Sequence, residues 1–243
     1  AKLNELLNAH LDYKQDVELG NCVVIGDTKL DIEMGRHIGA MTIWFLPYSI
    51  TNEIKEFVYS VGKKTNADVV ITEIGGTIGD IESQPFIEAV RQISLEVGRE
   101  NSLFIHVTMV PFLRGSGEHK SKPTQHSVKE LQGMGINPSI VVLRCDEPLE
   151  KSIFKKISLF CNVKLDCVIE NITLPNLYEA PLMLEKSNFS AVVCRELGIA
   201  APEPDLKEWT AMVERIKGRP YCVDIGLVGK YVGLHDAYLS VAE

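Results

Sequence analysis

Residues 72–92 read TEIGGTIGDIESQPFIEAVRQ, and this stretch decides the fold. A short apolar run, Asp68–Ile71, precedes it, and an amphipathic pattern typical of a helix continues over residues 83–99. Pro85 falls in the first turn of that helix, where its missing backbone N–H has no intrahelical partner to lose. An apolar strand, a glycine-rich loop and a helix in this order are typical of one unit of an α/β fold.

The same alternation runs through the rest of the chain. Helical patterns cover residues 50–63, 83–99, 124–134 and 149–160. Between them lie short β-branched runs, apolar on both faces, which are typical of buried parallel strands. These runs are Val23–Ile25, Met41–Phe45, Val69–Ile71, Leu103–Val110, Ile140–Leu143 and Cys167–Ile169. We therefore expect an α/β fold with a mainly parallel sheet flanked by helices.

Composition excludes several classes of protein. The 243 residues carry a net charge of −8 with no basic tail, which argues against nucleic acid as the main partner. No apolar run approaches the length of a membrane span. The six cysteines are scattered, without a CxxC pair, so we expect reduced thiols, no structural zinc and a cytoplasmic location.

Acidic residues gather around the glycine-rich loop. Glu73 ends the predicted strand, and Asp80 and Glu82 follow Gly79. In open α/β sheets, ligands bind outside the carboxyl ends of the strands. Carboxylates there can hold Mg²⁺ while a nucleotide supplies the remaining oxygens. The alternative is a plain glycine turn in which Asp80 or Ser83 caps the next helix.

A second polar cluster, EHKSKPTQHSVK, covers residues 118–129. Lys120 and Lys122 are two apart, so in an extended segment both point the same way and can meet phosphates. Gln125 can donate to and accept from the edge of a base. Because the cluster follows the strand Leu103–Val110, we expect it at the same sheet edge as Glu73. The alternative is a solvated loop that caps a helix.

Two further patterns contain residue types that bind metal ions. Residues 26–35, GDTKLDIEMG, place Asp27 and Asp31 after a strand, as in the first acidic loop. His106, His119 and His126 show no short ligand spacing, and we expect His106 to be a core histidine.

Residues 66–243 resemble the synthetase (amidoligase) domain of CTP synthase. The resemblance rests on EIGGTIGDIESQPFIEAVRQ, HVTMVPF, SGEHKSKPTQHSVKEL, KKISLFCNV and GLVGKYVGLHDAYLSV. It implies a P-loop-NTPase-like fold and an ATP-dependent amination of UTP to CTP. It also implies ammonia, delivered in the family by a C-terminal glutaminase domain, and a homotetramer.

The resemblance also implies residue roles. Glu73 corresponds to a Mg²⁺ ligand, and Glu170, Asn171 and Ile172 lie where the family contacts the adenine of ATP. The residues implied to bind UTP or CTP are Asp80, Ile81, Glu82, Lys120, Ser121, Lys122, Pro123, Thr124, Gln125 and Lys156.

The first quarter of the chain departs from this family pattern. Residues 1–66 contain no GGVxSxxGKG phosphate loop, so we expect ATP turnover to be impaired. Residues 20–45 instead resemble the last motif of haloacid-dehalogenase-like phosphatases, in which Asp27 and Asp31 would hold Mg²⁺. That family also needs an N-terminal DxDxT nucleophile, which the sequence lacks, so a working phosphatase is not expected.

These observations predict three regions. Residues 1–65 form an atypical α/β segment packed on the same sheet, and residues 66–198 form the synthetase core. Residues 199–243 form a linker and the start of a missing glutaminase domain, with a strand over Cys222–Val228. Two functions stay open, a CTP synthase-like amidoligase and a non-catalytic UTP/CTP-binding or oligomerisation module.

Overall fold

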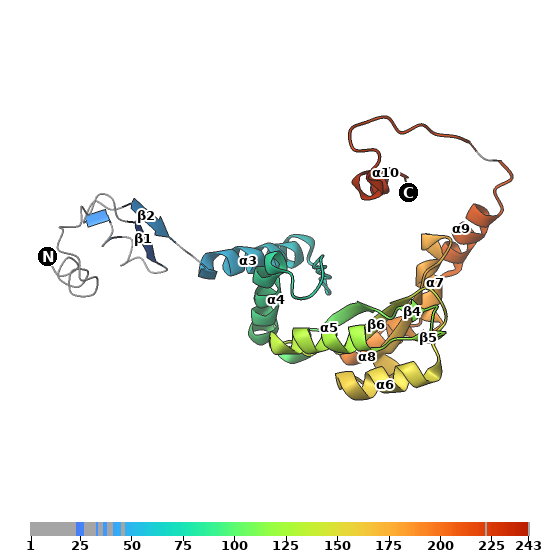
Figure 1. Ribbon diagram of the computed structural model, residues 1–243, viewed down its shortest axis with the longest axis horizontal. Coiled ribbons are helices and arrows are strands. Elements are labelled where there is room, and N and C mark those ends of the chain that lie inside the picture. The colour runs from blue at the N-terminus through green and yellow to red at the C-terminus, as the bar shows by residue number, and fades with distance from the viewer. Residues whose placement is uncertain are drawn as a thin grey trace.

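The computed structural model describes residues 23–26, 33, 36–37, 41–44, 47–221 and 223–242. Its centre is a three-stranded parallel sheet in the order β3-β6-β7, formed by Ile105–Met109, Ile140–Cys145 and Val168–Ile172 (Figure 1). Ile105 lies opposite Ile140, and Val141 lies opposite Val168. The predicted α/β fold with a mainly parallel sheet is confirmed.

Amphipathic helices connect these strands and form the core with them. α5 (Lys122–Gly133) joins β3 to β6, and α6 (Lys151–Cys161) joins β6 to β7. Their apolar faces supply Val128, Ile153 and Ile157 to the core, and β6 contributes four consecutive buried residues. After β7 the chain forms α7 (Ala180–Glu185) and α8 (Phe189–Glu196), of which α8 adds Val192 to the same core.

β3 is buried on one face only, although its sequence predicts burial on both. His106 and Thr108 point toward α5, where they hydrogen-bond to Ser127 and Thr124. On the opposite face Ile105, Val107 and Met109 are 41, 56 and 67% exposed. β3 is an edge strand, and no described helix covers its second face.

Two predicted strands are wrong. Val69–Ile71 is coil outside any ladder, and Ile71 is 91% exposed. Residues 223–228 of the predicted strand Cys222–Val228 are also coil, and Cys222 lies outside the described residues. Both runs have strand-like composition, but a strand also needs a partner to share its backbone hydrogen bonds. Neither run has one among the described residues.

Toward the N-terminus, β1 (Val23–Gly26) and β2 (Met41–Trp44) pair in parallel as a separate two-stranded sheet. α3 (Pro47–Thr65) packs on α4 (Gln84–Val97). Two side chains of α3, Lys55 and Tyr59, donate hydrogen bonds of 2.6 and 2.7 Å to Glu96 of α4. Both strands and both helices were predicted, and the structure confirms them.

The remaining elements are short apart from α9 (Lys207–Lys217). A hairpin pairs β4 (Phe112–Leu113) with β5 (Glu118–His119), and α10 (Leu239–Ala242) follows near the C-terminus. Single 3₁₀ turns are η2 (Ile81–Ser83), η3 (Arg99–Asn101), η4 (Leu165–Cys167), η5 (Leu177–Glu179) and η6 (His235–Tyr238). Among the described helices, none has the length and apolar character to cross a membrane.

Candidate functional site

The three parallel strands end at one edge of the sheet. β3 ends at Met109, β6 at Cys145 and β7 at Ile172. The pairing extends slightly further, because Val110 N donates to Arg144 O at 2.9 Å and Thr173 N donates to Cys145 O at 2.8 Å. The loops that follow all three strands therefore open on this edge, where ligands bind in open α/β sheets.

The predicted segment Lys120–Gln125 lies at this edge. The β4–β5 hairpin leads the chain back, and Lys120 N donates to Pro111 O at 3.0 Å. Ser121 precedes α5, is buried, and accepts a hydrogen bond of 3.0 Å from the side chain of Gln125. Pro123 lies in the first turn of the helix. The loop is thus held by its own side chains before any ligand arrives.

Thr124 fixes the start of α5 to the end of β3. Its side chain is completely buried, and its hydroxyl lies 3.1 Å from both Met109 O and Thr108 Oγ1. Both contacts are internal to the protein. In this structure Thr124 therefore positions the loop, and the exposed polar groups belong to its neighbours.

Three lysines gather on the surface formed by β5, α5 and α6. Lys120 Nζ lies 2.5 Å from Glu118 Oε1, and this hydrogen bond holds the pKa of Glu118 below its usual range. Lys156 of α6 attracts the same carboxylate more weakly. Lys122 Nζ lies 6.0 Å from the ring centroid of Phe160, also on α6. We call Lys120, Lys122 and Lys156 the lysine cluster. Lys120 and Lys156 thus act on one carboxylate, and Lys122 adds a third ammonium group at the start of α5, so the surface suits an anion.

Glu170, Asn171 and Ile172 lie at the carboxyl end of β7, on the same edge. Glu170 Oε1 accepts a hydrogen bond of 2.6 Å from Leu149 N, so this carboxylate orders the loop after β6. Asn171 and Ile172 pair with Arg144 and Cys145 of β6 and are half-buried. The structure thus places the predicted ATP residues and the lysine cluster at the same edge of the sheet, where the three strands have their carboxyl ends.

The glycine-rich loop is closed by its own side chains. Asp80 Oδ2 accepts a hydrogen bond of 2.8 Å from Thr77 N, and Ser83 Oγ donates to Gly75 O at 3.3 Å. Gly76 has φ +89, and a Cβ there would lie 3.1 Å from both Asp80 Oδ2 and Ser83 Oγ, so a side chain would be strained and would force both groups to shift. Neither Asp80 nor Ser83 caps the following helix with its side chain.

This loop and the lysine cluster lie at opposite ends of α5. A Cβ at Gly79 would come 3.8 Å from Cγ of Glu130, in the second half of the helix. Glu130 is six residues from Thr124, roughly 9 Å along the axis. Ile81 and Glu82 are exposed beside it, and Glu82 has no partner among the described residues. The structure therefore does not bring Asp80–Glu82 into direct contact with Lys120–Gln125.

Glu73 is the candidate magnesium ligand that the structure describes. Val69–Ile71 does not pair with the described sheet. Glu73 therefore does not follow a strand of that sheet, and no strand positions it at the carboxyl ends of β3, β6 and β7. Its carboxylate is exposed and bonds to no described residue. Mg²⁺ in proteins is held by one or two carboxylates plus substrate phosphates, so a single unpaired carboxylate fits this ion. Among the described residues, no group of three acids, histidines or cysteines could hold a metal alone. Asp27 and Asp31 lie outside the described residues.

Two of the described histidines, His106 and His119, have structural roles. Nε2 of His106 lies 2.8 Å from Ser127 Oγ, and burial lowers the pKa of this imidazole, as expected of a core histidine. His119, which sequence reasoning did not assign, packs on Phe112 with ring centroids 4.9 Å apart. Its Nδ1 lies 3.3 Å from Glu150 Oε1, and this contact ties the hairpin to the start of α6. The sequence gives no sign of this role of His119, because the hairpin strands are only two residues long and so show no periodicity.

Comparisons with known proteins agree with this geometry. The profile of the family described as CTP synthase N-terminus matches residues 18–199, which include the segment 20–45. CTP synthases from Ruminiclostridium cellulolyticum and Clostridium acetobutylicum are 57 and 56% identical over 209 residues. The CTP synthase from Pelotomaculum thermopropionicum is 55% identical over the same length.

The alignments cover 86% of this chain and 38–39% of each relative, so the chain spans about two fifths of their length. The family match covers well over half of the chain and includes the sheet, the glycine-rich loop and the lysine cluster. The chain therefore belongs to the CTP synthase N-terminus family.

Proposed function

We propose that this domain is the amidoligase part of a CTP synthase, which converts UTP to CTP with ATP and ammonia. ATP would transfer its γ-phosphoryl group to the 4-oxygen of UTP and leave as ADP. Ammonia would then attack carbon 4, the bond from carbon to the phosphorylated oxygen would break, and inorganic phosphate would leave. The lysine cluster beside the carboxyl ends of β3, β6 and β7 carries the proposal, because it suits a nucleotide triphosphate.

We assign the residues as follows. Lys120, Lys122 and Lys156 neutralise the triphosphate of UTP or CTP, and the free oxygen of Gln125 accepts from the ligand. Ser121, Pro123 and Thr124 hold the loop in shape. Asp80, Ile81 and Glu82 contact CTP when it binds as an inhibitor, and Glu170, Asn171 and Ile172 contact the adenine of ATP. Glu73 would hold Mg²⁺, which when bound neutralises charge on the transferred phosphoryl group.

The proposal extends to partners and organisation. Ammonia would come from a glutaminase domain joined through residues 199–243, and the assembled enzyme would be a homo-oligomer in the cytoplasm. We propose residues 66–198 as the synthetase core and residues 1–65 as an atypical N-terminal segment.

Calorimetric titration of CTP with Mg²⁺ tests the nucleotide assignment. Lys120→Ala and Lys156→Ala should each weaken CTP binding about tenfold or more, because each removes one charge-assisted contact. Lys129→Ala is the control, since Lys129 is an exposed lysine in the second half of α5, away from Lys120. Absence of CTP binding at millimolar concentration, or equal effects of all three substitutions, would refute the assignment.

A second candidate is a non-catalytic UTP/CTP-binding or oligomerisation module. It is favoured by the separation of the glycine-rich loop from the lysine cluster along α5 and by the lack of a phosphate-loop motif in residues 1–66. Detection of CTP formed from ATP, UTP and ammonia separates the two functions. Turnover above background that Lys120→Ala abolishes rules out the second candidate, and CTP binding without turnover rules out the first for this chain.

A further inference from the structure

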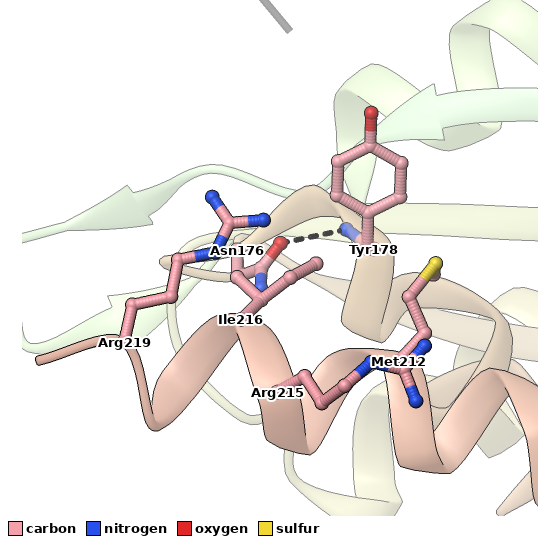
Figure 2. Close-up of a pocket in the computed structure, with 6 residues that line it drawn as sticks. All are labelled: Asn176, Tyr178, Met212, Arg215, Ile216 and Arg219. Carbon is pink, nitrogen blue, oxygen red and sulfur yellow. Dashed lines mark hydrogen bonds between the residues drawn. The ribbon is translucent and has the colours of Figure 1, made fainter.

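The last long helix of the described chain forms a cavity that the proposed reaction does not use. A cavity of about 500 Å³ lies between α9 and the segment that follows β7. Asn176 and Tyr178 come from that segment, and Met212, Arg215, Ile216 and Arg219 come from α9 and the residues just after it (Figure 2).

The walls of this cavity are held in place by contacts outside it. Trp209 Nε1 of α9 donates to Tyr178 O at 2.7 Å, and the two rings pack with centroids 6.4 Å apart. Lys217 Nζ lies 2.8 Å from Glu179 Oε2, and Val213 is completely buried. These contacts join α9 to the segment after β7, and the two together form the walls of the cavity.

Two guanidinium groups at the cavity, both of exposed residues, have no partner among the described residues. Neither Arg215 nor Arg219 forms an ion pair or side-chain hydrogen bond with a described residue. Lys217 is by contrast already paired with Glu179, and Glu214 lies 3.9 Å from the same ammonium. Both carboxylates thus lie beside Lys217, and no described carboxylate pairs with Arg215 or Arg219. The C-terminus of a helix adds only about half a negative charge, so the site keeps a positive excess.

An amide donor at the same cavity is also unsatisfied. Asn176 Oδ1 accepts a hydrogen bond of 3.0 Å from Tyr178 N, which fixes the orientation of the amide (Figure 2). Its Nδ2 is buried and has no partner among the described residues. Buried polar groups without partners are rare in native proteins, and a bound ligand is one common reason for an exception.

We propose that this cavity binds an organic phosphate. The phosphoryl oxygens would accept hydrogen bonds from Arg215 and Arg219, because a guanidinium matches phosphate with two parallel donors. A local shift on binding would expose Asn176 Nδ2, which is buried without a partner among the described residues, as a further donor. The side chains of Met212 and Ile216 would contact the organic part, and the cavity is far larger than phosphate alone requires. This site is separate from the lysine cluster, and its ligand need not be a substrate of the amination.

Phosphorus NMR titration of the whole chain with inorganic phosphate and with phenyl phosphate tests the proposal. The parent should bind phenyl phosphate more tightly than inorganic phosphate. Arg215→Gln and Arg219→Gln should each weaken phenyl phosphate binding about tenfold or more. Asn176→Asp should weaken it at least as much, although an aspartate keeps the acceptor for Tyr178 N and so preserves the local turn.

Two controls separate this site from others. Arg99→Gln removes an exposed arginine of η3, which is not at the cavity, and should leave phenyl phosphate binding within about twofold of the parent. Lys120→Ala should likewise leave it unchanged while it weakens CTP binding, so failure here is distinguishable from failure of the proposed function. The proposal is overturned if the parent does not bind phenyl phosphate at about 10 mM. It is also overturned if Arg99→Gln weakens phenyl phosphate binding as much as the cavity variants do. A third contrary result is that the cavity variants fold and bind phenyl phosphate as tightly as the parent.

Discussion

Replacing Thr124 by valine should destabilise the domain without changing the size of the side chain. Thr124 is completely buried at the junction of α5 and β3. Its single hydroxyl proton is donated to Met109 O, so the hydroxyl of Thr108 must donate to it in turn, each at 3.1 Å. Valine occupies nearly the same volume but offers neither a donor nor an acceptor.

The expected loss in the free energy of unfolding is about 2–3 kcal/mol. Each of the two hydrogen bonds contributes about 1 kcal/mol net, and the groups left behind in a buried place add a further penalty. Thr124→Ser is the matched control, because it keeps the hydroxyl and removes one methyl group, which costs about 1 kcal/mol. The valine variant should therefore be clearly less stable than the serine variant.

Urea unfolding followed by far-UV circular dichroism measures both variants. In the double variant Thr108→Val with Thr124→Val both hydroxyls are gone, so the second substitution should cost about 1 kcal/mol less than it does alone. A loss below about 0.5 kcal/mol for Thr124→Val, or an equal loss for Thr124→Ser, would refute the hydrogen-bonded junction.

Three further predictions follow from other parts of the molecule. Burial raises the pKa of Cys145 to about 12 and those of Cys161 and Cys167 to about 11, so iodoacetamide at neutral pH should modify these thiols slowly until urea is added. Peptide mapping by mass spectrometry checks this, and rapid native labelling would contradict it. Hydrogen bonds from Arg91 and then Gln92 lower the pKa of Glu88 from 4.5 to about 2. The pair is partly exposed, so Glu88→Gln should lower the free energy of unfolding by at most about 1 kcal/mol. This loss should be complete above pH 4.5 and should disappear as the pH falls toward 2, where the parent carboxylate is also protonated. A cost that does not change over this range in urea melts would count against the pair. Asn162 ends α6 with φ +54, so Asn162→Gly should be as stable as the parent, whereas Asn162→Val should lose about 1–2 kcal/mol. Equal thermal midpoints for the two variants would disprove this reasoning.

The sheet could be predicted from the sequence where a strand is apolar and is also buried on both faces. Ile140–Cys145 is buried along almost its whole length, and its β-branched run predicts this. The amphipathic period likewise located α3, α4, α5 and α6 to within a few residues. In these elements the local pattern and the packing agree.

Sequence reasoning failed where the outcome depends on a distant partner. Val69–Ile71 has the composition of a strand, but nothing in its pattern states whether a neighbouring strand pairs with it. The prediction that both faces of β3 are buried failed for the same reason. An apolar residue such as Val107 does not show whether another layer of the fold covers its face of the strand. Pairing and coverage are properties of the whole fold.

The candidate site was predictable in part. The KxK spacing and Lys156 signalled a cationic surface, and the structure places Lys120 and Lys156 beside Glu118. The burial of Thr124 and the use of Glu170 to order a neighbouring loop could not be predicted, because both depend on contacts across the sheet edge. Arg215 and Arg219 gave no signal, since isolated arginines near a helix end are usually solvated.

The strand order β3-β6-β7 bears on how the domain is made. Each strand pairs with the one that precedes it in the core, through a single intervening helix. During synthesis on the ribosome, β6 can therefore join β3 as soon as Cys145 has emerged, and β7 can add to that pair one helix later. Within the described residues, no later strand must insert between them. The core can grow in the direction of translation, with short loops to close at each step.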